Sequence, residues 1–159
     1  MRRPDAVAGR DARSARASFV ISIPSQTAFL GLIRELTRKM SACAGFDAGI
    51  AEQVALAVDE ATTNVIEHAY HGAGDKRVEL RLEDRGPELW VEILDSGARV
   101  DPRRFPEVDL ERYKSERRTG GLGVHLMGKI MDSVSFERRA RRNVCRLAKR
   151  KHLVRAGER

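Results

Sequence analysis

Residues 58–72 read Val-Asp-Glu-Ala-Thr-Thr-Asn-Val-Ile-Glu-His-Ala-Tyr-His-Gly, and the rest of the predicted fold is arranged around them. Read back to Asp47, the apolar residues of this region recur at steps of three and four, at Ile50, Val54, Ala57, Val58, Ala61, Val65 and Ala69. A helix turns about 100° per residue, so these side chains form one apolar stripe. Asp47 predicts the N-cap of this helix, and Gly72 with Gly74 predicts its end.

A second, polar stripe lies on the same helix, roughly 120° from the first. It consists of Glu60, Asn64, Glu67 and His71. Such a line of polar groups either serves only to contact water or supplies the acids, carboxamide and imidazole that a metal–phosphate site requires. The spacing alone leaves both interpretations open.

Length and composition predict one globular domain. The 159 residues are 42% hydrophobic and 33% charged, which is ordinary for a folded domain. No run approaches the ~18 apolar residues of a transmembrane helix, and no apolar segment follows the N-terminal arginines, so we expect neither a membrane span nor a secretory signal.

Cys43 and Cys145 lack paired spacing, which excludes a zinc framework and predicts a reducing, cytoplasmic location. The net charge of +7 lies mainly at the chain ends, but the basic residues from Arg138 onward lack interleaved aromatic side chains, so no direct nucleic-acid contact is expected.

Alternating side chains predict strands in three regions. Residues 18–24 form a short β-branched run closed by Pro24, which indicates an edge strand. Residues 78–83 and 88–95 flank the turn Asp-Arg-Gly-Pro and predict an antiparallel hairpin with one buried face. A second hairpin is expected at residues 132–138 and 143–149, with the facing side chains Val134, Phe136, Val144 and Leu147.

Helices complete the expected layout. Ser25 is predicted to cap a helix that runs to about Ala44, and a short helix is expected after Gly123. Residues 1–16 are interpreted as a mobile leader, 17–152 as the folded domain and 153–159 as a charged tail. The predicted fold class is α+β, with helices covering one face of a mainly antiparallel sheet.

Three polar constellations follow one another along the chain: Glu60 with Asn64, Asp95-Ser96-Gly97, and Gly120-Gly121-Leu122-Gly123. Residues 98–119, without periodicity, predict a lid or binding loop before the glycines. The glycines either allow a close helix entry or let backbone N–H groups approach a phosphate. Asp95 is either a turn residue or a carboxylate that accepts a hydrogen bond from an exocyclic amine.

Together these residues resemble the GHKL (Bergerat) ATP-binding fold of histidine kinases, type II topoisomerases and heat-shock chaperones, and more closely the anti-sigma-factor serine/threonine kinases of bacteria. Glu60-Ala-Thr-Thr-Asn64 with His68-Ala-Tyr resembles the family's N-box. Asp95-Ser96-Gly97 with Asp101-Pro102 resembles its G1 box. The G2 box is matched by Gly120, Gly121, Leu122, Gly123 and Val124. The resemblance spans about residues 18–151 and implies a two-layer Bergerat sandwich.

The resemblance also implies a role for each box. Asn64 would hold Mg²⁺ against ATP, and Glu60 would be the general base that takes the proton of an attacking serine hydroxyl. Asp95 would bind the adenine amine, with Gly97 leaving room for the base. The residues of the G2 box would line the phosphate end of the site. Arg99 replaces a glycine of the family pattern, which leaves the hinge of the lid undefined.

The implied function is an ATP-dependent anti-sigma-factor kinase. Such a protein binds a sigma factor, phosphorylates an anti-anti-sigma partner of the STAS type, and forms a homodimer, here through the N-terminal strand and helix. The alternative is an ATP- or ADP-sensing module that holds a regulatory partner without transferring phosphate. Glu60 favours the kinase, although the same carboxylate could also orient a water molecule on the metal.

Overall fold

The structure, a computed structural model, describes residues 17–99 and 122–151. The predicted leader at 1–16, most of the predicted lid, Gly120 with Gly121, and the predicted tail at 153–159 lie outside the described residues. In the described part of the chain, no helix combines the length and the apolar character needed to cross a lipid bilayer.

In the part of the chain that the structure describes, the sheet has five strands in the order β1-β2-β3-β5-β4, and every neighbouring pair is antiparallel. Their bounds are β1 Ser18–Pro24, β2 Arg77–Asp84, β3 Glu88–Asp95, β4 Ser133–Arg139 and β5 Arg142–Arg150. Both predicted hairpins are confirmed, and β1 is an edge strand as expected. Pro24 ends β1, where its missing N–H removes no bond from the centre of the sheet.

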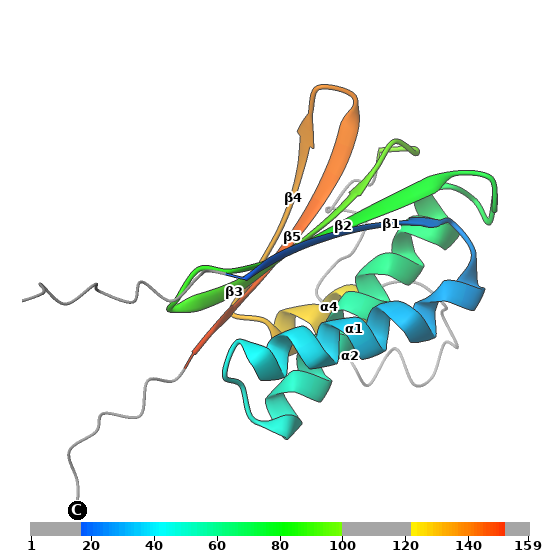
Figure 1. Ribbon diagram of the computed structural model, residues 1–159. Helices are drawn as coiled ribbons and strands as arrows, with labels where there is room; N and C mark the ends of the chain where they lie inside the picture. The colour runs from blue at the N-terminus through cyan, green and yellow to red at the C-terminus, as the bar shows by residue number, and fades with distance from the viewer. Residues whose placement is uncertain (1–16, 100–121, 152–159) are drawn as a thin grey trace, which may run out of the picture.

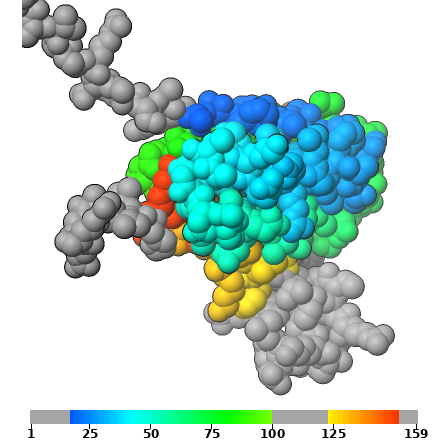
Figure 2. Space-filling view, turned by 60° about the horizontal axis from the view of Figure 1, so that its bottom comes forward, coloured from blue at the N-terminus to red at the C-terminus, as the bar shows by residue number. Residues whose placement is uncertain are grey.

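The helices all lie on one side of this sheet, so the molecule has two layers (Figure 1). Their bounds are α1 Leu30–Cys43, α2 Ala48–Asn64 and α4 Leu122–Ile130, and a short 3-10 turn at Thr27–Phe29 precedes α1. Figure 2 shows α1 and α2 on the outer side of the helical layer, with α4 next to α2. The predicted α+β class is therefore confirmed.

Helix α2 is the central element of the helical layer. Asp47 caps it as predicted, because its Oδ1 accepts a hydrogen bond from the backbone N–H of Ile50 at 2.9 Å. The predicted apolar stripe faces the sheet, and Val54, Ala57 and Val58 are fully buried. The helix continues into one π-helical turn, η2 (Val65–Ala69), and the chain then leaves through Gly72 at φ +76°, a backbone conformation that favours glycine.

The prediction that Ser25 caps a helix is wrong. The turn at Thr27 and helix α1 both begin without a side-chain cap. Ser25 is buried, and its hydroxyl donates to the carbonyl oxygen of Ala73 and accepts from the N–H of Lys76 at 3.1 Å. The serine therefore joins the end of β1 to the segment that follows η2, a contact between residues about 50 positions apart that no local pattern encodes.

The register of the second hairpin differs in one respect from the prediction. Phe136 pairs with Cys145 and Val134 with Leu147, but Val144 pairs with Glu137. Successive side chains of a strand alternate between faces, so Val144 belongs to the face away from the helices. The same alternation places Asn143 on the helix-facing side with Cys145, which matters for the site described next.

Candidate functional site

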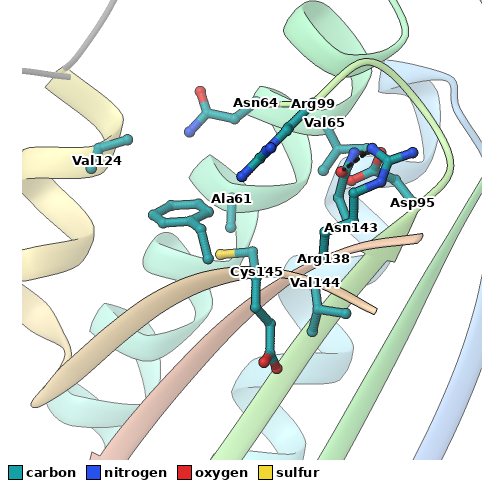
Figure 3. Close-up of a pocket in the computed structure, with 12 residues that line it drawn as sticks. Ala61, Asn64, Val65, Asp95, Arg99, Val124, Arg138, Asn143, Val144 and Cys145 are labelled. Carbon is teal, nitrogen blue, oxygen red and sulfur yellow. Dashed lines mark hydrogen bonds between the residues drawn. The ribbon is translucent and has the colours of Figure 1, made fainter. Parts of the chain in front are cut away.

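A pocket lies between the helical layer and one end of the sheet (Figure 3). Its cavity volume is about 70 Å³, and about 640 Å³ of space free of protein atoms lies within it when the open solvent at its mouth is included. Helices, strand ends and the β4–β5 hairpin all contribute to its wall, through Ala61, Asn64, Val65, Asp95, Arg99, Val124, Phe136, Glu137, Arg138, Asn143, Val144 and Cys145. Three of the sequence-predicted site residues, Asn64, Asp95 and Val124, therefore line one pocket.

Asp95 ends β3 on the helix-facing side and is only 4% exposed. Its Oδ1 accepts two hydrogen bonds of 2.8 Å, one from the backbone N–H of Gly97 and one from Nδ2 of Asn143. Burial raises the pKa of the Asp95 carboxyl, and these two hydrogen bonds act in the opposite direction. Asp95 therefore forms a local turn and also lines the pocket, and the acceptance of a hydrogen bond from an exocyclic amine stays a prediction.

Gly97 has a steric reason to be glycine. A Cβ at this position would lie 2.7 Å from the carbonyl carbon of Ala69, and closer still to its oxygen. The next residue, Ala98, donates its N–H to that same oxygen at 2.8 Å. The backbone after β3 therefore packs directly on the end of η2, and there is no space for a side chain between them.

Tyr70 holds the same turn from the other side. Its hydroxyl donates to the carbonyl oxygen of Arg77 at 2.7 Å and accepts from the N–H of Ser96 at 2.9 Å. The π turn that precedes Tyr70 is a rare conformation, and such turns occur frequently at functional sites. The burial of the polar stripe changes at this turn. Glu60 and Asn64, before it, are half-buried, whereas Glu67 and His71 are exposed.

Glu60, Asn64 and Gly123 meet where α2 packs against α4. A Cβ at Gly123 would lie 2.6 Å from Oε2 of Glu60 and 3.5 Å from Nδ2 of Asn64. Glu60 stands one turn before Asn64, beside the pocket rather than in its lining. Burial, followed by the negative charges of Asp59 and Glu67, raises the pKa of Glu60.

Among the described residues, no group of three or more His, Cys, Asp or Glu side chains could hold a metal ion. Mg²⁺, however, is usually bound through one or two protein oxygens together with substrate phosphates and water. The half-exposed carboxamide of Asn64, which faces the pocket, suits that kind of binding. Leu122 begins α4 one residue before Gly123, and the two preceding glycines of the predicted box lie outside the described residues.

Sequence reasoning missed the residues that the β4–β5 hairpin adds to the pocket. Cys145 is one of them, and burial raises the pKa of its thiol to about 12, so it is not a reactive thiolate. Asn143 and Arg138 are the others that carry polar groups toward Asp95. A signal was present, because the alternation that buries Cys145 and Leu147 also turns Asn143 toward the helices.

The chain is similar to several known proteins. Residues 23–149 match the family model of the histidine kinase-like ATPase domain. The chain is 30% identical over 124 residues to the serine-protein kinase RsbW of Bacillus pumilus (strain SAFR-032), covering 74% of this chain and 76% of that protein. It is 29% identical over 122 residues to RsbW of Bacillus subtilis (strain 168), with the same coverage, and 32% identical over 84 residues to the serine/threonine-protein kinase BtrW of Bordetella bronchiseptica (strain ATCC BAA-588 / NCTC 13252 / RB50), covering 53% and 59%.

The fold is also similar to that of a solved structure. It contains the RsbU and RsbW domains of a Mycobacterium tuberculosis protein, and the similarity has a TM-score of 0.60 at 13% sequence identity. The similarity covers 84% of this chain and 32% of the other, so this chain corresponds to about a third of that longer protein. At this identity the similarity concerns the fold alone.

Proposed function

The chain belongs to the histidine kinase-like ATPase domain family, among whose members it is similar to the RsbW serine-protein kinases, and from this membership we propose that it is an ATP-dependent serine/threonine-protein kinase. In this proposal it binds a sigma factor and phosphorylates an anti-anti-sigma partner of the STAS type in the cytoplasm. The observation that carries the proposal is the arrangement of one pocket, in which the buried carboxyl of Asp95 and the carboxamide of Asn64 face the same space, with Glu60 half-buried beside them.

The two ends of the site suit the two ends of ATP. Asp95 is buried and lines the pocket together with apolar residues such as Val65, so this end of the pocket suits the binding of the nucleotide base. Asn64 would hold Mg²⁺ and, with it, the triphosphate, while the N-terminus of α4 favours negative charge. When bound, the metal ion would neutralise phosphate charge, which is most of what phosphoryl transfer requires besides positioning.

Glu60 is assigned the proton transfer. Its carboxylate would accept the hydrogen of a serine or threonine hydroxyl as that oxygen attacks the terminal phosphate. Burial and neighbouring acids raise the pKa of Glu60, which makes the ionised group a better proton acceptor than an exposed glutamate.

The second candidate is a nucleotide sensor without kinase activity. One observation favours it. Asn64 and Asp95, which would bind the nucleotide, line the pocket, whereas Glu60, which would be needed only for catalysis, does not. A sensor would release or hold its partner according to whether ATP or ADP is bound.

Capture from the source cell separates these functions. The tagged chain should co-purify with adenine nucleotide and with two partners, a sigma factor and a small regulatory protein. Added ATP labelled in the γ-phosphate should transfer label to a serine or threonine of the small protein. Bound nucleotide without any transfer of label would support the sensor, and a preparation that binds guanine nucleotides as well as adenine nucleotides would contradict the assignment of Asp95.

We also propose that the chain forms a homodimer through β1 and α1. An edge strand leaves N–H and C=O groups that a second copy can pair with, and Val20 on β1 is 61% exposed. Leu32 on α1 is 53% exposed, so both elements offer apolar surface. Light scattering at micromolar concentration should give the mass of a dimer, with and without nucleotide, and a monomer mass in both conditions would remove this part of the proposal.

A further inference from the structure

Three polar side chains form a row across the end of the sheet. Asn143 of β5 pairs with Asp95 of β3 on one side and with Arg138 of β4 on the other. The row lies on the helix-facing side, and all three residues line the pocket. Figure 3 shows these three side chains gathered at one end of the pocket, with Val124 of α4 away from them.

The two oxygens of the Asp95 carboxyl differ in their hydrogen-bond partners. The N–H of Gly97 and Nδ2 of Asn143 both donate to Oδ1. Within residues 17–99 and 122–151, no donor reaches Oδ2. One oxygen of a largely buried carboxyl is thus held by the protein, and the other receives no hydrogen bond from the described residues.

The orientation of the Asn143 amide is determined by its neighbours. Its Nδ2 has three oxygens within hydrogen-bond distance, Oδ1 of Asp95 at 2.8 Å, the carbonyl of Ala98 at 3.1 Å and the carbonyl of Gly97 at 3.3 Å. Its Oδ1 accepts a 3.0 Å hydrogen bond from Nη1 of Arg138. A flipped amide would bring its oxygen against three acceptors and its nitrogen against a guanidinium, so only one orientation is satisfied.

We propose that Asn143, held by Arg138, is the positioning residue that gives the pocket its preference for a 6-aminopurine over a 6-oxopurine. The inference rests on the nucleotide-binding function proposed above and adds to it the residue pair that enforces base selectivity. Asn143 acts through Asp95: it occupies Oδ1 with a donor, so the carboxylate cannot rotate freely and Oδ2 accepts the exocyclic amine. A 6-oxo group presents an acceptor at the same place, and two facing acceptors repel each other.

The protonation state of Asp95 links the row to this selectivity. A protonated Asp95 could donate a hydrogen bond to a 6-oxo group, and discrimination between the two purines would then fall. Burial favours the protonated form, whereas the donors Asn143 and Gly97 and the positive charges of Arg138 and Arg142 favour the ionised form. Among the described residues, the other titratable groups around the carboxyl are Tyr70 directly after η2, Cys145 on β5 and, in the same pocket, Arg99. In a variant that lacks the Asn143 amide, the pH at which the preference between the two purines declines should therefore be higher than in the wild type.

The test compares the binding of two nucleoside diphosphates, which avoids turnover. Calorimetry of the full chain with Mg²⁺ would give the affinities for ADP and for IDP, whose base carries a 6-oxo group, across a range of pH. The variants are Asn143→Ala and Arg138→Met. Arg139→Met is the matched control, since Arg139 is adjacent on β4 but bonds to Glu92 and Glu137 instead of Asn143.

The wild-type chain should prefer ADP, and Asn143→Ala should reduce the ADP/IDP affinity ratio by about tenfold or more, the usual scale of a hydrogen bond to a charged group. Arg138→Met should reduce the ratio less, Arg139→Met should leave it unchanged, and the pH at which the ratio declines should rise in Asn143→Ala. Equal weakening of ADP and IDP in Asn143→Ala, or an unchanged ratio and pH profile in both variants, would overturn the inference while leaving nucleotide binding intact. If Asn143→Ala does not fold, the Arg138→Met variant, which changes an exposed residue, tests the inference alone. A wild-type chain that binds neither nucleotide refutes the proposed function itself, a result distinct from either of these.

Discussion

Replacing Glu60 with glutamine is expected to lower phosphorylation of the captured partner by about 10²–10⁴-fold, the usual contribution of a general base. Glutamine keeps the size and the hydrogen-bonding groups of the side chain but cannot take a proton from the attacking hydroxyl. Nucleotide affinity should change little, because Glu60 does not line the pocket. The measurement is the single-turnover rate of phosphate transfer from labelled ATP, together with calorimetric nucleotide affinity.

Stability provides the first control for this variant. Folding raises the pKa of Glu60, so its ionisation costs more free energy in the folded chain than in the unfolded chain. That cost is absent below the ordinary pKa of a glutamate and grows as the pH rises through the raised folded value. At neutral pH, Glu60→Gln should therefore melt at the same temperature as the wild type or slightly above it, and a markedly lower melting temperature would point to structural damage instead of lost proton transfer.

Two further substitutions separate the base from its surroundings. Asn64→Ala removes the group proposed to hold Mg²⁺, so it should weaken nucleotide binding itself. Gly123→Ala would push the Glu60 carboxylate aside, whereas Gly128→Ala on the same helix meets no atom within 4 Å and serves as its matched control. A Glu60→Gln chain that transfers phosphate at the wild-type rate would make the sensor the better interpretation.

Replacing Gly97 with alanine is expected to abolish nucleotide binding and to destabilise the fold by roughly 1–3 kcal/mol or more, the usual cost of forcing extra atoms into a packed site. The added Cβ would meet the backbone of Ala69, which cannot move aside as the end of a flexible side chain can. Relief would require the turn after β3 to leave η2. The hydrogen bond from Gly97 N–H to Asp95 and the one from Ser96 N–H to Tyr70 would both be disturbed.

Urea unfolding and calorimetry measure the two parts of this prediction. Gly31→Ala is the control, because Gly31 lies in α1 with no atom within 4 Å of an added Cβ. That substitution should stabilise the helix by up to about 1 kcal/mol, since alanine has the higher helix propensity. Wild-type nucleotide affinity in Gly97→Ala would contradict the close packing of this turn and with it the assigned shape of the base pocket.

The elements themselves follow from local patterns in the sequence. The apolar stripe and the cap at Asp47 predict α2, and alternation predicts both hairpins, because these signals depend on residues only a few positions apart. The family resemblance rests on the same kind of short-range motif, and the match over residues 23–149 confirms it. The same motifs are sufficient to single out Glu60, Asn64 and Asp95 as candidate site residues.

The contacts between those elements depend on the tertiary structure. The hydroxyl of Ser25 reaches Ala73, and Asn143 reaches Asp95, each across 48 positions of sequence. A hydroxyl that can cap a helix is equally able to bond to a distant backbone, and only the packing of β1 beside the segment after η2 selects between these partners.

The amino-acid sequence is thus enough to specify the helices, the hairpins and the main polar motifs, because periodicity and capping act within one or two turns of chain. Three features of the site arise only when the elements pack together: the register that gives Asp95 its partner Asn143, the lack of space beside Gly97, and the approach of Gly123 to Glu60. The physical reason is that register and helix-to-helix distance are set by side chains from separate elements packing together, and any one segment contains only half of each such contact.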